Sequence, residues 1–130
     1  MLADRNTSAI VAVSDIERAR SFYSDVLGLT LEGEVMGDAL IFRAGQTQFT
    51  VYSSPFAGTN KANAMTFAMQ GDLVETVQAL VAKGVVFEHY DIPGMVLNGD
   101  VHESGATRLA WLADPDGNLI HLVEGMPVQK

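Results

Sequence analysis

The chain has 130 residues, of which 48% are hydrophobic and 18% are charged, proportions typical of one globular domain with its own core. Sixteen Asp and Glu against eight Lys and Arg give a formal net charge of −8. This charge repels the phosphates of nucleic acids, so no nucleic-acid partner is expected. The acidity contributes to solubility in the simplest interpretation, and it also permits a cationic ligand. Cysteine is absent, which excludes disulfides and thiolate metal sites.

The sequence gives no signal for export or for a membrane. It contains no run of about 18 apolar residues, which a membrane-spanning helix would need. Its first residues lack the basic region and apolar core of a signal peptide. We therefore expect a cytoplasmic protein that does not insert into a membrane.

The first half of the chain begins with a short apolar strand at residues 8–13, followed by a helix. Ser14 and Glu17 have the spacing of a capping box at the helix start. Apolar side chains recur at helical spacing from Ile16 onward, and Gly28 stands where a glycine ends a helix. Turn residues then separate three expected strands, at residues 30–36, 39–44 and 48–53.

The second half repeats this order of elements. A strand at residues 65–69 precedes a second capping-box pattern, which begins at Asp72, and the helix ends at Gly84. The helix thus starts and ends at residues that match Asp15 and Gly28 of the first half. Three further strands are expected at residues 86–92, 107–113 and 119–124.

The repeat indicates an internal duplication of a βαβββ module, at about residues 8–53 and 65–124, joined by a linker at 54–63. Neither half has enough core to be stable alone, so the halves should combine into one domain over residues 1–130. The predicted fold class is α+β. A second irregular segment, residues 93–106, is a candidate lid because Met95 and its apolar neighbours could contact a ligand.

The densest turn signal is Asp114-Pro115-Asp116-Gly117-Asn118, in which Asp, Pro, Gly and Asn each suit a turn position. The strand after this turn alternates, so that His121 shares a face with two apolar neighbours. This histidine could be a metal ligand, a general base or a hydrogen-bonding group in a pocket. The alternative is a hydrogen-bonded histidine with a structural role only.

Several segments resemble the vicinal oxygen chelate superfamily, which includes glyoxalase I, bleomycin-resistance proteins, fosfomycin-resistance enzymes and extradiol dioxygenases. The resemblance covers about residues 8–124. It implies paired βαβββ modules whose strands form a curved mixed sheet around a cup. In metal-dependent members the cup holds a divalent cation that activates substrate oxygens. The segments that carry the resemblance are residues 13–15, 18–19, 22–23, 26–29, 85–94 and 111–118.

The metal-ligand positions that the resemblance implies fall on Ser8, Met65 and His121. A hydroxyl and a thioether are poor ligands for such cations, so no conventional metal centre and no other cofactor is expected. A divalent ion would need His121 together with Gln48 or Glu124, in an unusual geometry.

Other side chains could line the cup or belong to the core. If Phe87 marks the inner face of its strand, His89 and Asp91 could form a pair there, although a solvent-side pair is the simpler interpretation. His102 is expected in a solvated loop. The candidate ligand-binding set is completed by two aromatic residues expected at the base of the cup and one further tyrosine: Phe67, Trp111 and Tyr52.

From these observations we expect a protein that binds a small organic molecule in an apolar cup, with His121 as its polar group. The bleomycin-resistance type is the nearest model that the resemblance offers. One alternative is a metal-assisted lyase, isomerase or dioxygenase-like enzyme that uses His121. Another is a domain whose role is dimerisation alone. The resemblance also implies a homodimer, because small members of the superfamily commonly form dimers.

Overall fold

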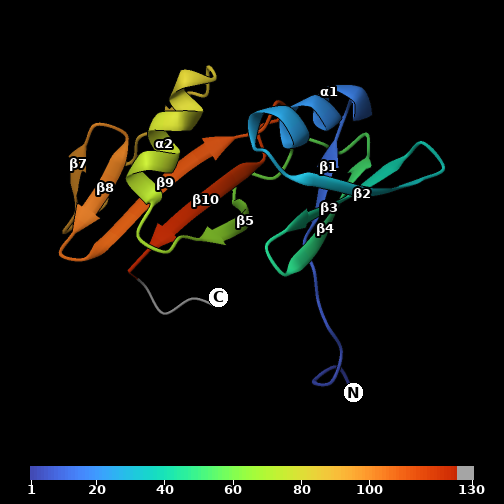
Figure 1. Cartoon of the computed structure of the whole chain (residues 1–130), viewed down its shortest axis with the longest axis horizontal. Helices are drawn as coiled ribbons and strands as arrows, with labels where there is room; N and C mark the ends of the chain where they lie inside the picture. Colours follow the sequence, from blue (N-terminus) through green and yellow to red (C-terminus); the bar gives the residue numbers. More distant parts are fainter. Residues whose placement is uncertain (126–130) are drawn as a thin grey trace. The chain divides into compact units, whose positions relative to one another are not determined.

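The computed structural model describes residues 1–125 and has two compact units (Figure 1). Unit 1 comprises Met1–Asn60, and unit 2 begins at Lys61. The boundary between them lies within the segment 54–63. Both units combine one helical segment with a sheet of parallel and antiparallel strand pairs, so the predicted α+β class is confirmed.

Unit 1 has the predicted βαβββ order. Its sheet has the strand order β1-β4-β3-β2, with β1 parallel to β4 and the other pairs antiparallel. Its elements are β1 (Ile10–Val13), α1 (Ile16–Ser21), the π-helical turn η1 (Phe22–Val26), β2 (Thr30–Val35), β3 (Ala39–Ala44) and β4 (Thr47–Ser53).

The capping of both helices differs from the prediction. At α1 the capping residue is Asp15, not Ser14, and its carboxylate accepts a hydrogen bond from the Arg18 amide at 3.1 Å. In unit 2 the carboxylate of Asp72 does not cap the helix; the Leu73 amide instead donates to Glu124 on a distant strand, at 3.0 Å. The capping-box patterns therefore located the helix starts without identifying the capping groups.

The core of unit 1 lies between its helical segment and one face of its sheet. Tyr23 is fully buried, and its ring lies 5.6 Å from that of Phe42 and 5.7 Å from that of Phe49. Alternate residues of β1, β3 and β4 are buried on the same face, which is the pattern of a sheet covered on one side. The other buried apolar residues of this unit are Val11, Val13, Ala19, Leu40 and Val51.

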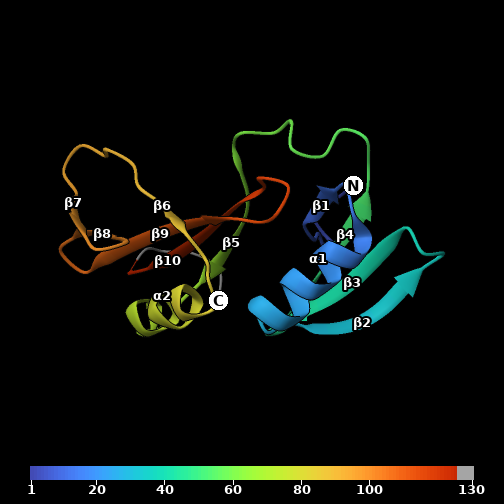
Figure 2. The same cartoon turned by 90° about the horizontal axis from the view of Figure 1, so that it is seen from above.

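Unit 2 has more strands than the predicted module. Its six-stranded sheet has the order β5-β10-β9-β8-β7, and β6 also pairs with β9. Figure 2 shows the added β7–β8 hairpin at the end of the unit 2 sheet. The elements are β5 (Asn63–Ala68), α2 (Leu73–Ala82), β6 (Phe87–Glu88), β7 (Val96–Asn98), β8 (Val101–Ser104), β9 (Thr107–Ala113) and β10 (Leu119–Glu124).

The hairpin corrects the prediction that residues 93–106 are irregular. A two-residue turn with Gly99 at positive φ (64°) connects β7 to β8, which is a common hairpin geometry. The predicted strand at 86–92 is correspondingly reduced to two residues, because β8 pairs with the first half of β9 and β6 with the second half. One long strand of the predicted module is thus replaced by two short ones.

The two faces of the unit 2 sheet differ in what covers them. On one face, here called the helix face, the buried side chains of Leu112, Ile120 and Leu122 share the core with Leu73 and Val77 of α2. Because side chains alternate along a strand, Trp111 and His121 point to the other face, here called the His121 face. None of the helices within residues 1–125 has the length and apolar character needed to cross a membrane.

Candidate functional site

Four side chains form a row across neighbouring strands on the His121 face. Glu88 of β6 is the register partner of Trp111 on β9. Trp111 is also the partner of His121 on β10, and His121 is the partner of Thr66 on β5. Register partners in a sheet lie side by side on one face, about 4.8 Å apart from strand to strand. The row therefore places a carboxylate, an indole, an imidazole and a hydroxyl in sequence.

His121 is the central polar group of this row. Its ring stacks on the indole of Trp111, with centroids 4.6 Å apart and planes 10° from parallel. The Nδ1 atom lies 3.5 Å from the Thr66 hydroxyl oxygen, whereas the buried Nε2 atom has no hydrogen-bond partner within the described residues. Burial penalises the charged form and lowers the pKa of His121 below 6.5. The imidazole is therefore neutral at pH 7, with one buried nitrogen that lacks a hydrogen bond in the part of the chain that the structure describes.

Trp111 is held from its other sides by two rings. Tyr90 and His102 both lie nearly perpendicular to the indole, at centroid distances of 5.1 and 5.0 Å. The Tyr90 amide donates to His102 Nε2 at 2.9 Å, and His102 Nδ1 lies 3.3 Å from the Leu109 carbonyl oxygen. Because Nε2 accepts, Nδ1 must carry the proton, so His102 is a neutral imidazole with both nitrogens engaged.

The position of His102 corrects a prediction. We expected a solvated loop residue, but His102 belongs to β8 and is 1% exposed. The prediction failed because β8 itself was not recognised, and without a strand nothing indicated that this side chain lies on a buried face. His102 instead anchors the backbone at Tyr90 and holds the indole beside His121.

Glu88 ends the row with a carboxylate that is half-buried. Within residues 1–125 its side chain has no ion pair or hydrogen bond. Desolvation raises the pKa of the Tyr90 phenol, and the negative charge of Glu88 raises it further. The carboxylate is thus close to the aromatic part of the row and lacks a compensating cation from its own unit.

Two of the predicted ligand-binding residues point away from His121. Met65 and Phe67 are the register partners of Ile120 and Leu122, so they lie on the helix face. The resemblance implied Met65 as a ligand position of the cup, one residue away from the residue that faces His121. A slip of one residue moves a side chain to the opposite face of a sheet. Thr66, the next residue, is the one beside His121.

The pair predicted between His89 and Asp91 is not formed in the structure. Phe87 is the register partner of the buried Leu112 and marks the helix face, which puts Glu88 on the His121 face. His89 lies beyond the end of β6, and its Nε2 is 2.7 Å from a carboxylate oxygen of Asp100, not of Asp91. The predicted contact residue Met95 is half-buried in the loop before β7.

The remaining predicted residues belong to unit 1. Ser8 is exposed and precedes β1, and Tyr52, on the sheet face opposite the core, is 36% exposed. The Gln48 amide donates to Glu32 at 2.5 Å, and the same carboxylate accepts from Arg43 at 2.7 Å. Gln48 is thus already engaged within its own unit.

The donors around His121 in unit 2 do not fit a catalytic divalent cation. Its neighbours in the row contribute one neutral hydroxyl and one indole, neither of which is a strong ligand. Glu124, the other candidate ligand on β10, lies on the helix face, where it accepts from the Leu73 amide and from Arg108. Within residues 1–125 no three side chains of the types His, Asp and Glu cluster as a metal site would need.

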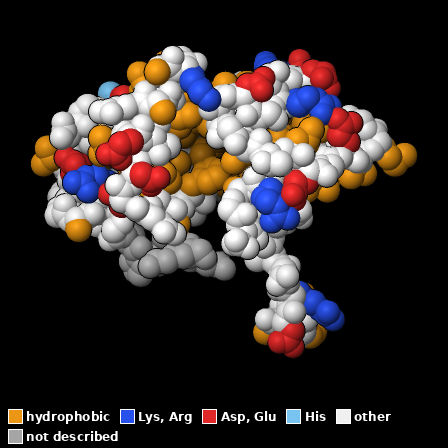
Figure 3. Space-filling model, viewed as in Figure 1, with side chains coloured by type: hydrophobic (Ala, Val, Ile, Leu, Met, Phe, Trp, Pro, Cys, Tyr) orange, Lys and Arg blue, Asp and Glu red, His pale blue; other side chains and the backbone are white. Residues whose placement is uncertain are grey.

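The helix face carries a second polar row, in which the charges are paired. Arg108 of β9 donates to Glu103 on β8 at 2.9 Å and to Glu124 on β10 at 3.1 Å. Hydrogen bonding to Asn98 and Arg108 lowers the pKa of Glu103. In Figure 3 acidic and basic side chains lie side by side over this part of unit 2. This row links four strands to the start of α2.

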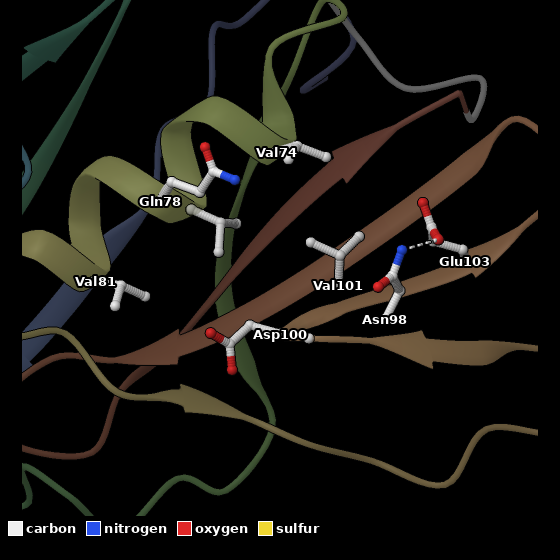
Figure 4. A pocket seen from close by; sticks show the side chains of 9 residues that line it. Val74, Gln78, Val81, Asn98, Asp100, Val101 and Glu103 are labelled. Atoms are coloured by element: carbon white, nitrogen blue, oxygen red, sulfur yellow. Dashed lines mark hydrogen bonds between the residues drawn. The ribbon is translucent and has the colours of Figure 1, made fainter.

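A groove of about 450 Å³ lies beside this row, between α2 and the β7–β8 hairpin (Figure 4). Its valines come from α2 and from β8, and its two carboxylates are already engaged. Glu103 accepts from Asn98 and Arg108, and Asp100 is paired with His89. The groove therefore has fewer free polar groups than the His121 face. Its lining residues are Val74, Val77, Gln78, Val81, Asn98, Gly99, Asp100, Val101 and Glu103.

Sequence reasoning missed Glu88 and Thr66 as members of the site. The signal for Glu88 was its position next to Phe87, once Phe87 is assigned to the core face. The signal for Thr66 was its polarity within an otherwise apolar strand. Assigning Glu88 and Thr66 to the site required the strand register, which the β-propensity of the residues does not provide.

Comparison with known proteins gives one family and a consistent fold. The sequence model of the Glyoxalase/Bleomycin resistance protein/Dioxygenase superfamily matches residues 7–122. No curated protein sequence matches the chain. Among solved structures, lactoylglutathione lyase from Agrobacterium tumefaciens is similar with a TM-score of 0.70 and 18% identity, over 94% of either chain.

Two further solved structures, a fosfomycin resistance protein and an integron cassette protein, have the same fold as this chain. The fosfomycin resistance protein FosX from Listeria monocytogenes has a TM-score of 0.72 and 15% identity, over 94% of this chain and 93% of its own. An integron cassette protein from V. cholerae has a TM-score of 0.65 and 20% identity, over 97% of this chain and 100% of its own. Identities this low establish a shared fold, while the chemistry of a site depends on its own residues.

Proposed function

This chain belongs to the Glyoxalase/Bleomycin resistance protein/Dioxygenase superfamily, and we propose that it binds a small organic molecule on the His121 face of unit 2, without a conventional metal centre. The observation that carries the proposal is the buried Nε2 atom of His121, which has no partner within the described residues. A buried polar atom without a hydrogen bond costs about 1–3 kcal/mol, which a ligand that supplies the bond would recover.

The neighbours of His121 support a ligand with an apolar or planar body. Tyr90 provides an exposed aromatic ring that packs on the buried Trp111, and the Thr66 hydroxyl can either donate to Nδ1 or accept from it. When Thr66 donates to Nδ1, the proton of the neutral imidazole is on Nε2, which is then a donor. When Thr66 accepts from Nδ1, Nε2 is an acceptor. One site can therefore hold a hydroxyl, an amine or a carbonyl group.

Enzymatic proton transfer is the second candidate, and one observation favours it. A neutral imidazole with a free nitrogen is the form that accepts a proton from a substrate. An enzyme of this kind would change its ligand chemically, whereas a binding protein would release the ligand unchanged. Mass spectrometry of the ligand after incubation with the protein distinguishes the two.

Binding can be tested through Trp111, the only tryptophan in the chain. We expect members of a library of small aromatic and heterocyclic compounds to change its fluorescence and to raise the melting temperature, because a ligand selective for the folded state stabilises it. The substitution His121→Gln should abolish both effects. His89→Gln is the matched control, since His89 is an exposed imidazole outside the row.

The proposal is wrong if no compound binds, or if His121→Gln leaves binding unchanged. The metal-free part is tested separately by elemental analysis after dialysis against Zn²⁺, Mn²⁺ and Ni²⁺. We expect no stoichiometric ion. An ion bound in equal amount to the protein, and lost in His121→Gln, would overturn this part.

Three expectations from the sequence stay predictions: the single domain over residues 1–130, the homodimer and the cytoplasmic location. Light scattering coupled to gel filtration measures the mass in solution and so tests the dimer. Cooperative unfolding of the whole chain in one transition would support a single domain.

A further inference from the structure

We infer that the ligand of the His121 face is an organic cation, a protonated amine, whose ammonium group binds at Glu88 while its apolar body lies against the exposed ring of Tyr90, beside Trp111. The inference rests on the proposed function and names its ligand class. It follows from the order of the row, in which a carboxylate, an aromatic surface and a neutral hydrogen-bonding group are consecutive.

The Glu88 carboxylate lacks a cationic partner within residues 1–125. Three other carboxylates with comparably buried side chains have cationic partners: Glu32 is paired with Arg43, Glu103 with Arg108, and Asp100 lies against His89. Glu88 is half-buried and has no such partner within residues 1–125. Partial burial of an unpaired charge is unfavourable, and a bound ammonium group would remove that cost.

Two aromatic rings lie next to this carboxylate. Trp111 is the register partner of Glu88, and Tyr90 follows two residues later and responds electrostatically to the same carboxylate. An ammonium group near indole or phenol rings is attracted by their π-electrons. The carboxylate and the rings therefore favour the same charge on a ligand.

Within residues 1–125, the rest of the row contains no group that would repel a cation or compete with it. His121 is stacked on Trp111 and is neutral at pH 7, so it does not repel a cation bound beside it. On the His121 face the row contains no Lys or Arg that would compete for the carboxylate. The net charge of −8 also attracts cations to the protein at long range. A ligand anion would be repelled both by the nearby Glu88 carboxylate and by the net charge of the protein.

Two probes of nearly equal shape test the inference: benzylammonium, which is cationic at pH 7.5, and benzyl alcohol, which is neutral. Binding is followed by Trp111 fluorescence and by amide chemical shifts of the intact protein. We expect benzylammonium to bind at least about 10-fold more tightly, a difference that one charge-assisted hydrogen bond supplies. Added NaCl should weaken benzylammonium binding and leave benzyl alcohol unchanged.

Glu88→Gln, which keeps the shape of the side chain, should reduce this preference to less than about twofold. Glu75→Gln is the matched control, because Glu75 is exposed on α2 and the substitution removes the same charge; it should retain the preference. Equal binding of the two probes, or a preference that survives Glu88→Gln, overturns the inference.

The outcomes also separate this inference from the proposed function. If benzylammonium does not bind, but neutral compounds bind in a His121-dependent manner, the cationic ligand class is wrong and the binding function stands. If no compound of either kind binds in a His121-dependent manner, both are wrong. Amide chemical-shift spectra of the variants identify any substitution that disturbs the fold.

Discussion

The two faces of the unit 2 sheet carry polar rows that are built alike and completed differently. On the helix face, Arg108 lies between Glu103 and Glu124, and Glu124 in turn binds the first amide of α2. On the His121 face, Glu88 and His121 flank Trp111. Within residues 1–125 the Glu88 carboxylate has no ion pair or hydrogen bond, and the Nε2 atom of His121 has no hydrogen-bond partner. Both rows use β9 as their centre.

The difference shows which row serves the fold and which is available for function. A polar row in which each charge is paired contributes to holding strands and helix together. Groups left without partners at partly buried positions cost stability, and such costs persist where a ligand can offset them. Pairing, rather than residue type, therefore distinguishes the candidate site from the structural network.

The largest effect is expected from breaking the support of the His121 row at His102. His102→Phe keeps a ring against Trp111 but leaves the Tyr90 amide without its acceptor. An amide that loses its acceptor at a part-buried position costs about 1–3 kcal/mol, so the free energy of unfolding should fall by that amount in urea titrations followed by circular dichroism. His89→Phe, at an exposed site, should change it by less than about 0.5 kcal/mol.

A smaller effect is expected when the row on the helix face loses its contact with α2. Glu124→Ala removes the acceptor of the Leu73 amide, and loss of such a helix-capping group costs about 1 kcal/mol. Glu124→Gln retains an acceptor oxygen and should cost less. If the two variants are equally destabilised in the same urea titration, Glu124 stabilises the fold through its ion pair with Arg108 and not through the capping of α2.

The smallest effect should come from pH and should be confined to the His121 row. Burial lowers the pKa of His121 below 6.5, so the unfolded chain takes up its proton at a higher pH than the folded chain. The stability associated with the neutral imidazole is therefore complete above about pH 6.5 and is lost as the pH falls through the folded pKa. Melting temperatures from pH 8 to 5 should decline more steeply for the wild type than for His121→Gln; parallel declines would contradict this.

Much of the fold was predictable from local pattern. The strands β3, β9 and β10 match the predicted bounds, because alternation and flanking turn residues delimit them. The carboxylate of Asp114 accepts from two amides in the turn, as the Asp-Pro-Asp-Gly-Asn motif indicates. The β7–β8 hairpin was missed because its strands are short and β7 is exposed throughout.

The site was less predictable than the fold. Alternation within one strand predicted the face of His121, and the register puts Trp111, a candidate for the base of the cup, on the same face. Met65 and Phe67 were placed in the cup, but the observed register puts both on the helix face, on either side of Thr66 in the sequence. His102 was misplaced for the related reason that its strand was not recognised.

By itself, the sequence determined the family, the α+β class, the duplication of the module and a histidine on the strand after the Asp-Pro-Asp-Gly-Asn turn. These depend on periodicity and turn chemistry, which act over a few neighbouring residues. Only the tertiary structure decided that Glu88 and Thr66 complete the row of His121, and that Glu124 belongs to the opposite face. Strand register joins residues far apart in the chain, and a shift of one residue exchanges the two faces.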